Sequence, residues 1–150
     1  MELTLAENQP TGEGYYRNVQ ANLTAALVMT KQFHVLTDLN LTLNGTEYKP
    51  DISLYMKARD EVMYLRDIEN ISEIPLGIVE VLSPEQTMEG VQEKFMQYFQ
   101  AGVQSCWLVS PAMKTVSVYL NPIKSLVFNV GEVVEDARLD IGLMAGDIFA

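Results

Sequence analysis

The feature that most constrains the fold is an apolar run at residues 76–82, Leu-Gly-Ile-Val-Glu-Val-Leu, which carries a single carboxylate. In a β-strand, alternation puts Ile78, Glu80 and Leu82 on one face, and Val79 with Val81 on the other. A strand that is apolar on both faces needs cover on each side, as in the centre of a sheet packed between helices. We therefore expect a sheet with helices on both faces.

The segment before this strand predicts one helix and a hairpin. Apolar residues in steps of three and four, beginning at Tyr16, predict an amphipathic helix from Tyr15 to about Lys31. Asn44-Gly45 is a strong hairpin signal because both residues tolerate positive φ. Pro50 cannot donate a ladder hydrogen bond, so it marks an edge or a bulge in the return strand. The predicted strands cover residues 33–36, 39–43 and 48–56, and residues 57–75 suit either a short helix or an irregular packed insert.

The segment after it predicts a helix and more strands. Pro84 and Glu85 suit a first helical turn, and the helix runs to about Ala101, with Gly102 as its C-terminal cap. A strand at residues 103–109 and an alternating strand at 116–120 should pair as an antiparallel hairpin; residues 126–130 and 133–134 suggest a small strand pair around Gly131, and the apolar tail at 141–149 should pack on the core.

Length and composition fit one folded domain. The chain has 150 residues, of which 48% are hydrophobic and 20% charged, which is ordinary for a globular protein. We expect a single α/β domain over residues 1–150, with a loose segment at 1–14 and a mixed β-sheet covered by helices. The sequence carries no export signal and no apolar stretch of about 18 residues. Its single cysteine allows no internal disulfide, so we expect a cytoplasmic protein without a membrane anchor.

The formal net charge is −10, and the ten Lys and Arg residues are scattered one at a time. Proteins that grip a polyanion usually show a basic patch. The charge therefore argues against tight nucleic-acid binding by a lone monomer, and it is compatible with cation binding.

Two carboxylates and a lysine form the one convincing chemical constellation. Glu80 lies in an apolar strand, where an uncompensated carboxylate is costly. Asp51 lies on the predicted neighbouring strand, and like charges about 4 Å apart repel by roughly 4 kcal/mol at an effective dielectric near 20. A divalent cation such as Mg²⁺, which binds carboxylates, water and phosphate oxygens, converts that repulsion into a binding site. Lys94 borders the sheet-facing stripe of the next helix and can reach toward Glu80.

The same residues carry a family resemblance. The sequence resembles a large bacterial family of restriction endonucleases (Uma2-like) in the PD-(D/E)XK nuclease-like superfamily. The matching features are Pro50-Asp51 as the upstream "PD", residues 78–84, Lys94, Tyr98, residues 101–103 and 107–111, and the closing residues 143–149.

The resemblance implies a restriction-endonuclease-like core that hydrolyses DNA with Mg²⁺ or Mn²⁺ held by Asp51 and Glu80. It places Leu82 where the superfamily usually has its lysine, and Lys94 from the next helix substitutes. Ser83 and Tyr98 join Lys94 as candidate substrate-binding residues. The predicted first helix, from Tyr15 on, contains no acid that could add a ligand, and Glu13 is a poor stand-in.

Two functions remain open. The first is a metal-dependent endonuclease, favoured by Asp51, Glu80 and Lys94. The second is a catalytically inactive binding or regulatory module of the same fold, favoured by Leu82 and the acidic charge. A homodimer could supply the DNA contacts that one copy lacks. The lone histidine, His34, and the lone cysteine, Cys106, are interpreted as structural.

Overall fold

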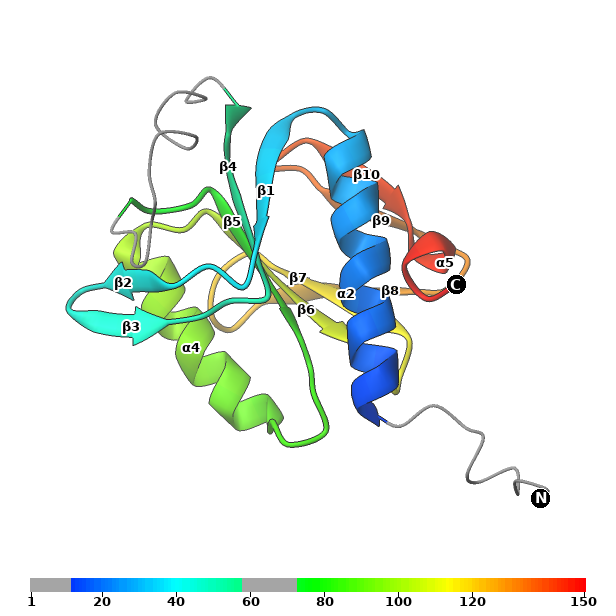
Figure 1. Ribbon diagram of the computed structural model, residues 1–150, viewed down its shortest axis with the longest axis horizontal. Coiled ribbons are helices and arrows are strands. Elements are labelled where there is room, and N and C mark those ends of the chain that lie inside the picture. The colour runs from blue at the N-terminus through cyan, green and yellow to red at the C-terminus, as the bar shows by residue number, and fades with distance from the viewer. Residues whose placement is uncertain (1–11, 58–72) are drawn as a thin grey trace, which may run out of the picture.

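The computed structural model describes residues 12–57 and 73–150 (Figure 1). Its elements, in chain order, are α2 (Gly12–Met29), β1 (Phe33–Thr37), β2 (Leu41–Leu43), β3 (Thr46–Tyr48), β4 (Ile52–Met56), β5 (Gly77–Val81), α4 (Met88–Ala101), β6 (Ser105–Ser110), β7 (Thr115–Tyr119), β8 (Ser125–Asn129), β9 (Val133–Asp136), β10 (Ile141–Met144) and α5 (Ala145–Ile148). None of these described helices is long and apolar enough to cross a membrane.

A six-stranded mixed sheet forms the centre of the molecule, in the order β1-β4-β5-β6-β7-β8. The β5–β6 pair is parallel and the other pairs are antiparallel. All five residues of β5 are buried, because β4 and β6 flank it in the sheet and helices cover both faces. The predicted α/β class and the central position of this strand are confirmed.

Each face of the sheet has its own apolar core. On one face, Val79 and Val81 pack with Leu23 and Leu27 of α2 and with the C-terminal segment. On the other face, Ile78 packs with the buried stripe of α4. Figure 1 shows this division: α2, α5 and the β9–β10 hairpin lie on one side, and α4 with the β2–β3 hairpin lies on the other. Glu80 shares the face of Ile78 and therefore points into the α4 layer.

The helix α4 begins later than predicted. Pro84 and Glu85 form a turn, and the helix starts at Met88. Thr87 is the N-cap, because its hydroxyl accepts a hydrogen bond from Gly90 N at 3.0 Å. The predicted C-cap is confirmed: Gly102 has φ 110°, and its N–H bonds back to the last helical turn.

The predicted hairpin turn is confirmed, but the return strand is wrong in extent. Asn44 and Gly45 have φ values of 51° and 80°, and they join β2 to β3 as a separate two-stranded sheet. The pairing stops at Tyr48, and a new strand, β4, begins beyond Pro50 and pairs with β1 instead. Pro50 lacks the N–H that a continuous ladder would need, so it separates two strands and is not a bulge within one.

The strands predicted around Gly131 do not pair with each other. β8 pairs with β7 and extends the main sheet, whereas β9 pairs with β10. The buried carboxylate of Asp136, at the end of β9, accepts hydrogen bonds from Trp107 Nε1 at 2.8 Å and from the hydroxyl of Ser105. This network attaches the β9–β10 hairpin to β6, a constraint that the local sequence pattern does not contain. The predicted packing of the tail is confirmed, since Ile141, Ala145 and Ile148 are buried.

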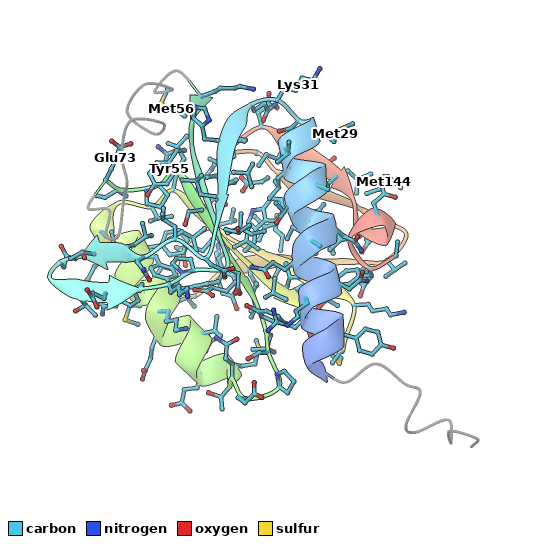
Figure 2. All side chains as sticks on the ribbon, viewed as in Figure 1. Met29, Lys31, Tyr55, Met56, Glu73 and Met144 are labelled. Atoms are coloured by element: carbon cyan, nitrogen blue, oxygen red, sulfur yellow. The ribbon has the colours of Figure 1, made fainter. Side chains whose placement is uncertain are left out.

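Most of the ambiguous stretch at residues 57–75 lies outside the described residues. Where the chain is described again, the hydroxyl of Tyr55 on β4 donates to the carbonyl of Glu73 at 2.9 Å. Figure 2 labels both residues at the same end of the sheet. This bond fixes the approach to β5.

Candidate active site

Asp51 and Glu80 meet where β4 and β5 run side by side. The antiparallel register pairs Ile52 with Val79, so Asp51, one residue before Ile52, lies beside Glu80, one residue after Val79. Asp51 Oδ2 accepts a hydrogen bond from Val81 N at 2.6 Å, and each carboxyl group alters the pKa of the other. The side chains are 6% and 2% exposed. The predicted convergence of these two distant acids is therefore observed.

Burial dominates the electrostatics of the pair. Loss of hydration raises the pKa of Asp51 to about 6, although the bond from Val81 N, the bond to Glu80 and the charge of Lys94 each lower it. Loss of hydration likewise raises the pKa of Glu80 to about 7, with Tyr98 and Lys94 acting in the opposite direction. The two acids consequently hold at least one proton between them in mildly acidic solution.

A tyrosine from each helical layer supports one carboxylate. Tyr98 of α4 donates its hydroxyl to Glu80 Oε2 at 2.6 Å, and its side chain is fully buried. Tyr16 of α2 donates its hydroxyl to Asp51 Oδ1. Burial and the neighbouring Glu80 raise the pKa of Tyr98, so this phenol remains a donor at all working pH values. Sequence reasoning placed Tyr16 on an apolar stripe and missed its role. The available signal was a hydroxyl on a helix face that turns toward the sheet.

Lys94 joins the site from the outer side of α4. It is partly exposed, and its charge lowers the pKa of both carboxyl groups. It also lines an open hollow of about 710 Å³ between β3 and α4, together with Tyr48 and Glu93. Helix α4 therefore contributes two residues to the site: Lys94 at its partly exposed rim and Tyr98 in its buried core.

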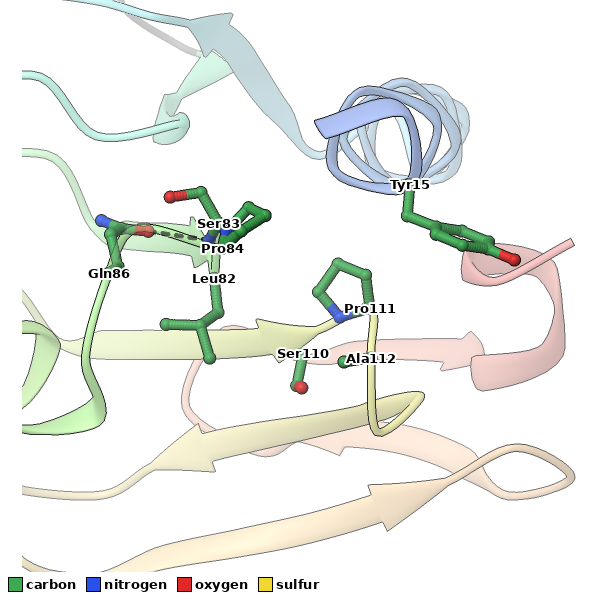
Figure 3. Close-up of a pocket in the computed structure, with 8 residues that line it drawn as sticks. All are labelled: Tyr15, Leu82, Ser83, Pro84, Gln86, Ser110, Pro111 and Ala112. Atoms are coloured by element: carbon green, nitrogen blue, oxygen red, sulfur yellow. Dashed lines mark hydrogen bonds between the residues drawn. The ribbon is translucent and has the colours of Figure 1, made fainter. Parts of the chain in front are cut away.

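Ser83 lies at a second hollow, of about 370 Å³, where the chain leaves β5 (Figure 3). The loop after β5, the turn after β6 and the start of α2 form its walls. The lining residues are Tyr15, Leu82, Ser83, Pro84, Gln86, Ser110, Pro111 and Ala112. The backbone N–H of Ser83 donates to Gln86 Oε1 at 3.0 Å, which fixes the loop. Leu82 contributes an apolar side chain to this hollow. By the family resemblance, this is the position at which the superfamily usually has its lysine.

The remaining sequence candidates occupy structural positions. His34 is buried on β1, with Nε2 3.1 Å from the carbonyl of Lys57. Cys106 is fully buried, and this burial raises the pKa of its thiol. The first helix begins at Gly12 and so includes Glu13, contrary to the predicted start at Tyr15. Among the described residues, no group of three or more His, Cys, Asp or Glu side chains is arranged to hold a metal.

Comparison with known proteins identifies the family. The family model of Uma2, described as "Putative restriction endonuclease", matches residues 4–142. The chain belongs to the Uma2 family. Among solved structures, it is similar to the "putative nuclease belonging to DUF820 from Anabaena variabilis ATCC 29413", with 21% identity and a TM-score of 0.74 over 90% of this chain and 80% of that chain. No curated protein matches the sequence. The fold of this Uma2 member is thus nuclease-like, as the resemblance implied.

Proposed function

We propose that this Uma2 protein is a metal-dependent endonuclease that hydrolyses DNA phosphodiester bonds. The observation that carries the proposal is the buried pair of Asp51 and Glu80, which the register of β4 and β5 places side by side. Two carboxylates buried side by side repel each other when both are ionised. A divalent cation can relieve this repulsion in place of a proton. Perturbed carboxylates beside a cationic side chain are typical of functional sites.

The donor set fits a hard cation. Asp51 and Glu80 offer carboxylate oxygens, which Mg²⁺ and Mn²⁺ prefer, and Mg²⁺ sites commonly use one or two carboxylates with water and phosphate oxygens completing the shell. When bound, such an ion would activate water and neutralise the charge that develops on the phosphate. The ion would also remove the destabilisation that burial imposes on the two anions.

The chain's own residues would hold this arrangement. Tyr98 and Tyr16 each donate to one carboxylate oxygen, so each acid keeps a fixed orientation and has one oxygen committed to a phenol. Lys94 supplies a positive charge at the rim, where it would bind the phosphate or orient the attacking water. Because Tyr98 is fully buried, we now propose that it positions Glu80 and does not touch substrate. Ser83 stays a candidate substrate contact.

Plasmid nicking tests the proposal. We expect the wild-type protein to nick supercoiled DNA with Mg²⁺ or Mn²⁺ but not with EDTA. Glu80→Gln and Lys94→Ala should each lose at least about 100-fold in rate, because the first removes a proposed metal ligand and the second removes the positive charge proposed to act on the phosphate. Matched controls are Glu135→Gln and Lys124→Ala, which change exposed residues of the same types elsewhere. Equal activity of Glu80→Gln and wild type would refute the proposal.

The alternative is a catalytically inactive module of the same fold, and the net charge of −10 favours it. Calorimetric titration with Mn²⁺ separates the two functions when it is combined with the nicking assay. Metal binding that depends on Glu80, without nicking, would identify an inactive binding module. Equal heats in wild type and Glu80→Gln would remove the metal site itself.

The proposal extends to location and assembly. We place the activity in the cytoplasm, where DNA is accessible, and we propose a homodimer, in which a second copy would supply contacts to the duplex. Sedimentation of the pure protein tests the dimer: a monomeric mass at micromolar concentration, with and without metal, would exclude it.

A further inference from the structure

The hollow beside Ser83 has a mostly apolar lining with a few polar groups. Its lining includes Tyr15, Pro84 and Pro111, and its polar groups are Ser83, Gln86 and Ser110. Figure 3 shows Leu82 and Pro84 on one side, with Tyr15 and Pro111 on the other, and the ring of Tyr15 extends away from Pro84. No Lys, Arg, Asp or Glu is among the residues that line it. The hollow therefore suits a neutral, largely apolar ligand with hydrogen-bonding atoms on its rim.

The hollow lies next along the chain to the groups that hold the carboxylate pair, although neither Asp51 nor Glu80 lines it. Leu82 and Ser83 directly follow Val81, whose N–H holds Asp51. Tyr15 directly precedes Tyr16, whose hydroxyl holds the other oxygen of Asp51. At about 3.3 Å per residue along a strand, Leu82 lies within one nucleotide's reach of Glu80. A ligand in the hollow and a phosphate at the carboxylates can belong to the same nucleotide.

We propose that this hollow binds an unstacked nucleobase next to the phosphodiester that is cleaved, so that the substrate is single-stranded or locally unpaired DNA. The inference rests on the proposed function and specifies its substrate class. In a duplex, neighbouring bases cover the faces of each base and only the edges are open in the grooves. Aromatic and other apolar side chains contact the faces, and such side chains bind bases that have left the stack.

The charge of the molecule agrees with this assignment. Duplex binders gain most of their affinity from many phosphate contacts by Lys and Arg. This chain has ten such residues against twenty acids, and they line neither the hollow nor its floor. Stacking of a base in a neutral hollow gives affinity that does not require a basic surface.

Binding measurements without cleavage test the base site independently of the nuclease activity. Deoxyadenosine, which has no phosphate, should perturb the NMR signals of Tyr15 and Ser83 in the absence of metal. Deoxyribose 5-phosphate, which has no base, should not. In Ca²⁺, which also takes oxygen ligands, a labelled single-stranded decamer should bind at least about tenfold more tightly than its duplex by fluorescence anisotropy.

Variants locate the effect. Tyr15→Ala should weaken binding of the single strand by about tenfold, whereas Tyr15→Phe, which keeps the aromatic face, should retain it. Tyr15 is 46% exposed, so its loss should leave the melting temperature nearly unchanged. Met29→Ala, at the far end of the same helix and 76% exposed, is the matched control.

The outcomes for the hollow and for the nuclease separate cleanly. Nucleoside binding at Tyr15 without any metal-dependent nicking would keep the base site and overturn the proposed function. Glu80-dependent nicking with no strand preference, and with no effect of Tyr15→Ala, would keep the nuclease and overturn the base site. An RNA decamer of the same sequence serves as a further ligand, and tighter binding of this RNA than of the DNA decamer would overturn DNA as the substrate of this hollow.

Discussion

At Glu80, burial and hydrogen bonding act on the same carboxyl group in opposite directions. Loss of hydration raises its pKa, and the hydroxyl of Tyr98 lowers it by donating to the anion. The net result is an acid that titrates near neutrality, with a pKa of about 7. Under the proposed function, Glu80 would exchange its proton for a cation near neutral pH.

Removing the phenol should move this balance. In Tyr98→Phe the Glu80 anion loses its donor while it stays buried, so its pKa should rise. A hydrogen bond to a charged group contributes about 1.5–3 kcal/mol, which corresponds to an upward change of about 1–2 in pKa. Mn²⁺ affinity, measured by calorimetry between pH 6 and 8.5, should reach its plateau at correspondingly higher pH. Tyr119→Phe, a change in the same apolar layer, should behave as wild type. An unaltered pH profile in Tyr98→Phe would contradict this account of Glu80.

The same shifts predict how stability depends on pH. Both folded-state pKa values, about 6 and about 7, lie above the ordinary values of 3.8 and 4.5. The folded state therefore binds more protons than the unfolded state between about pH 4 and 7. The contribution of these two groups to the free energy of unfolding should be highest below about pH 4, and it should fall as the pH rises through 7.

For one buried acid this loss is on the order of 3 kcal/mol. Urea unfolding of the metal-free protein from pH 4.5 to 8 measures it. Glu80→Gln, which cannot ionise, should flatten the decline, and saturating Mn²⁺ should offset it in the wild type. A metal-free protein whose stability rises from pH 5 to 7.5, with Glu80→Gln following the same curve, would show that the pair does not set the profile.

At the scale of elements, α4 carries both Tyr98 and Lys94, and its two ends are fixed by Thr87 and Gly102. Gly102 has φ 110°, a backbone conformation that a residue with a Cβ adopts at a cost. A Cβ there would meet Ile74 Cδ1 at 3.8 Å, an ordinary contact, so the cost is conformational and not a clash.

Gly102→Ala should therefore lower the free energy of unfolding by about 1–2 kcal/mol without changing the pH dependence of Mn²⁺ binding. Gly146→Ala is the matched control, because that glycine has no positive φ and no neighbouring atom within 4 Å of a new Cβ. Thermal unfolding of both variants measures the difference. Equal melting temperatures for Gly102→Ala and Gly146→Ala would mean that the left-handed cap does not hold the end of α4.

What the sequence could predict at this scale was local periodicity and turn chemistry. Three features follow from neighbouring residues alone: the apolar run around Glu80, the Asn44-Gly45 turn and the Gly102 cap. The pairing of strands does not follow from neighbouring residues. β8 joins β7, and β9 joins β10, and Asp136 of β9 binds Trp107 and Ser105 of β6 across the fold. A contact between residues so distant in sequence leaves no periodic signal.

The candidate site divides in the same way. Glu80 stood out because a carboxylate in a strand buried on both faces requires compensation, and Asp51 followed from the neighbouring strand. Tyr16 did not stand out, since a tyrosine on an apolar helix stripe is usually packing. Only the position of α2 against β4 shows that its hydroxyl reaches Asp51.

At the scale of the whole molecule, the charge and the architecture impose different demands on nucleic-acid binding. The sheet supplies a rigid frame in which two layers each contribute a phenol to one carboxylate pair. The surface carries a net charge of −10, which opposes a polyanion at long range and is screened within about 8–10 Å at physiological salt. Recognition should therefore depend on short-range contacts at the site and should weaken much less with added salt than recognition by a protein with many phosphate contacts.

Salt dependence measures this balance directly. With Lys94 as the cationic side chain at the site, we expect one or two phosphate contacts, so the slope of log Kobs against log salt for a single-stranded decamer should be about −0.7 to −1.4. Lys94→Ala should make the slope less negative by about 0.7, and Lys124→Ala should leave it unchanged because that exposed lysine precedes β8, away from the carboxylate pair. Anisotropy titrations in Ca²⁺ from 50 to 300 mM KCl give the slopes. A slope of −4 or steeper would require a broad basic footprint with many phosphate contacts, and it would contradict recognition through one or two contacts at this site.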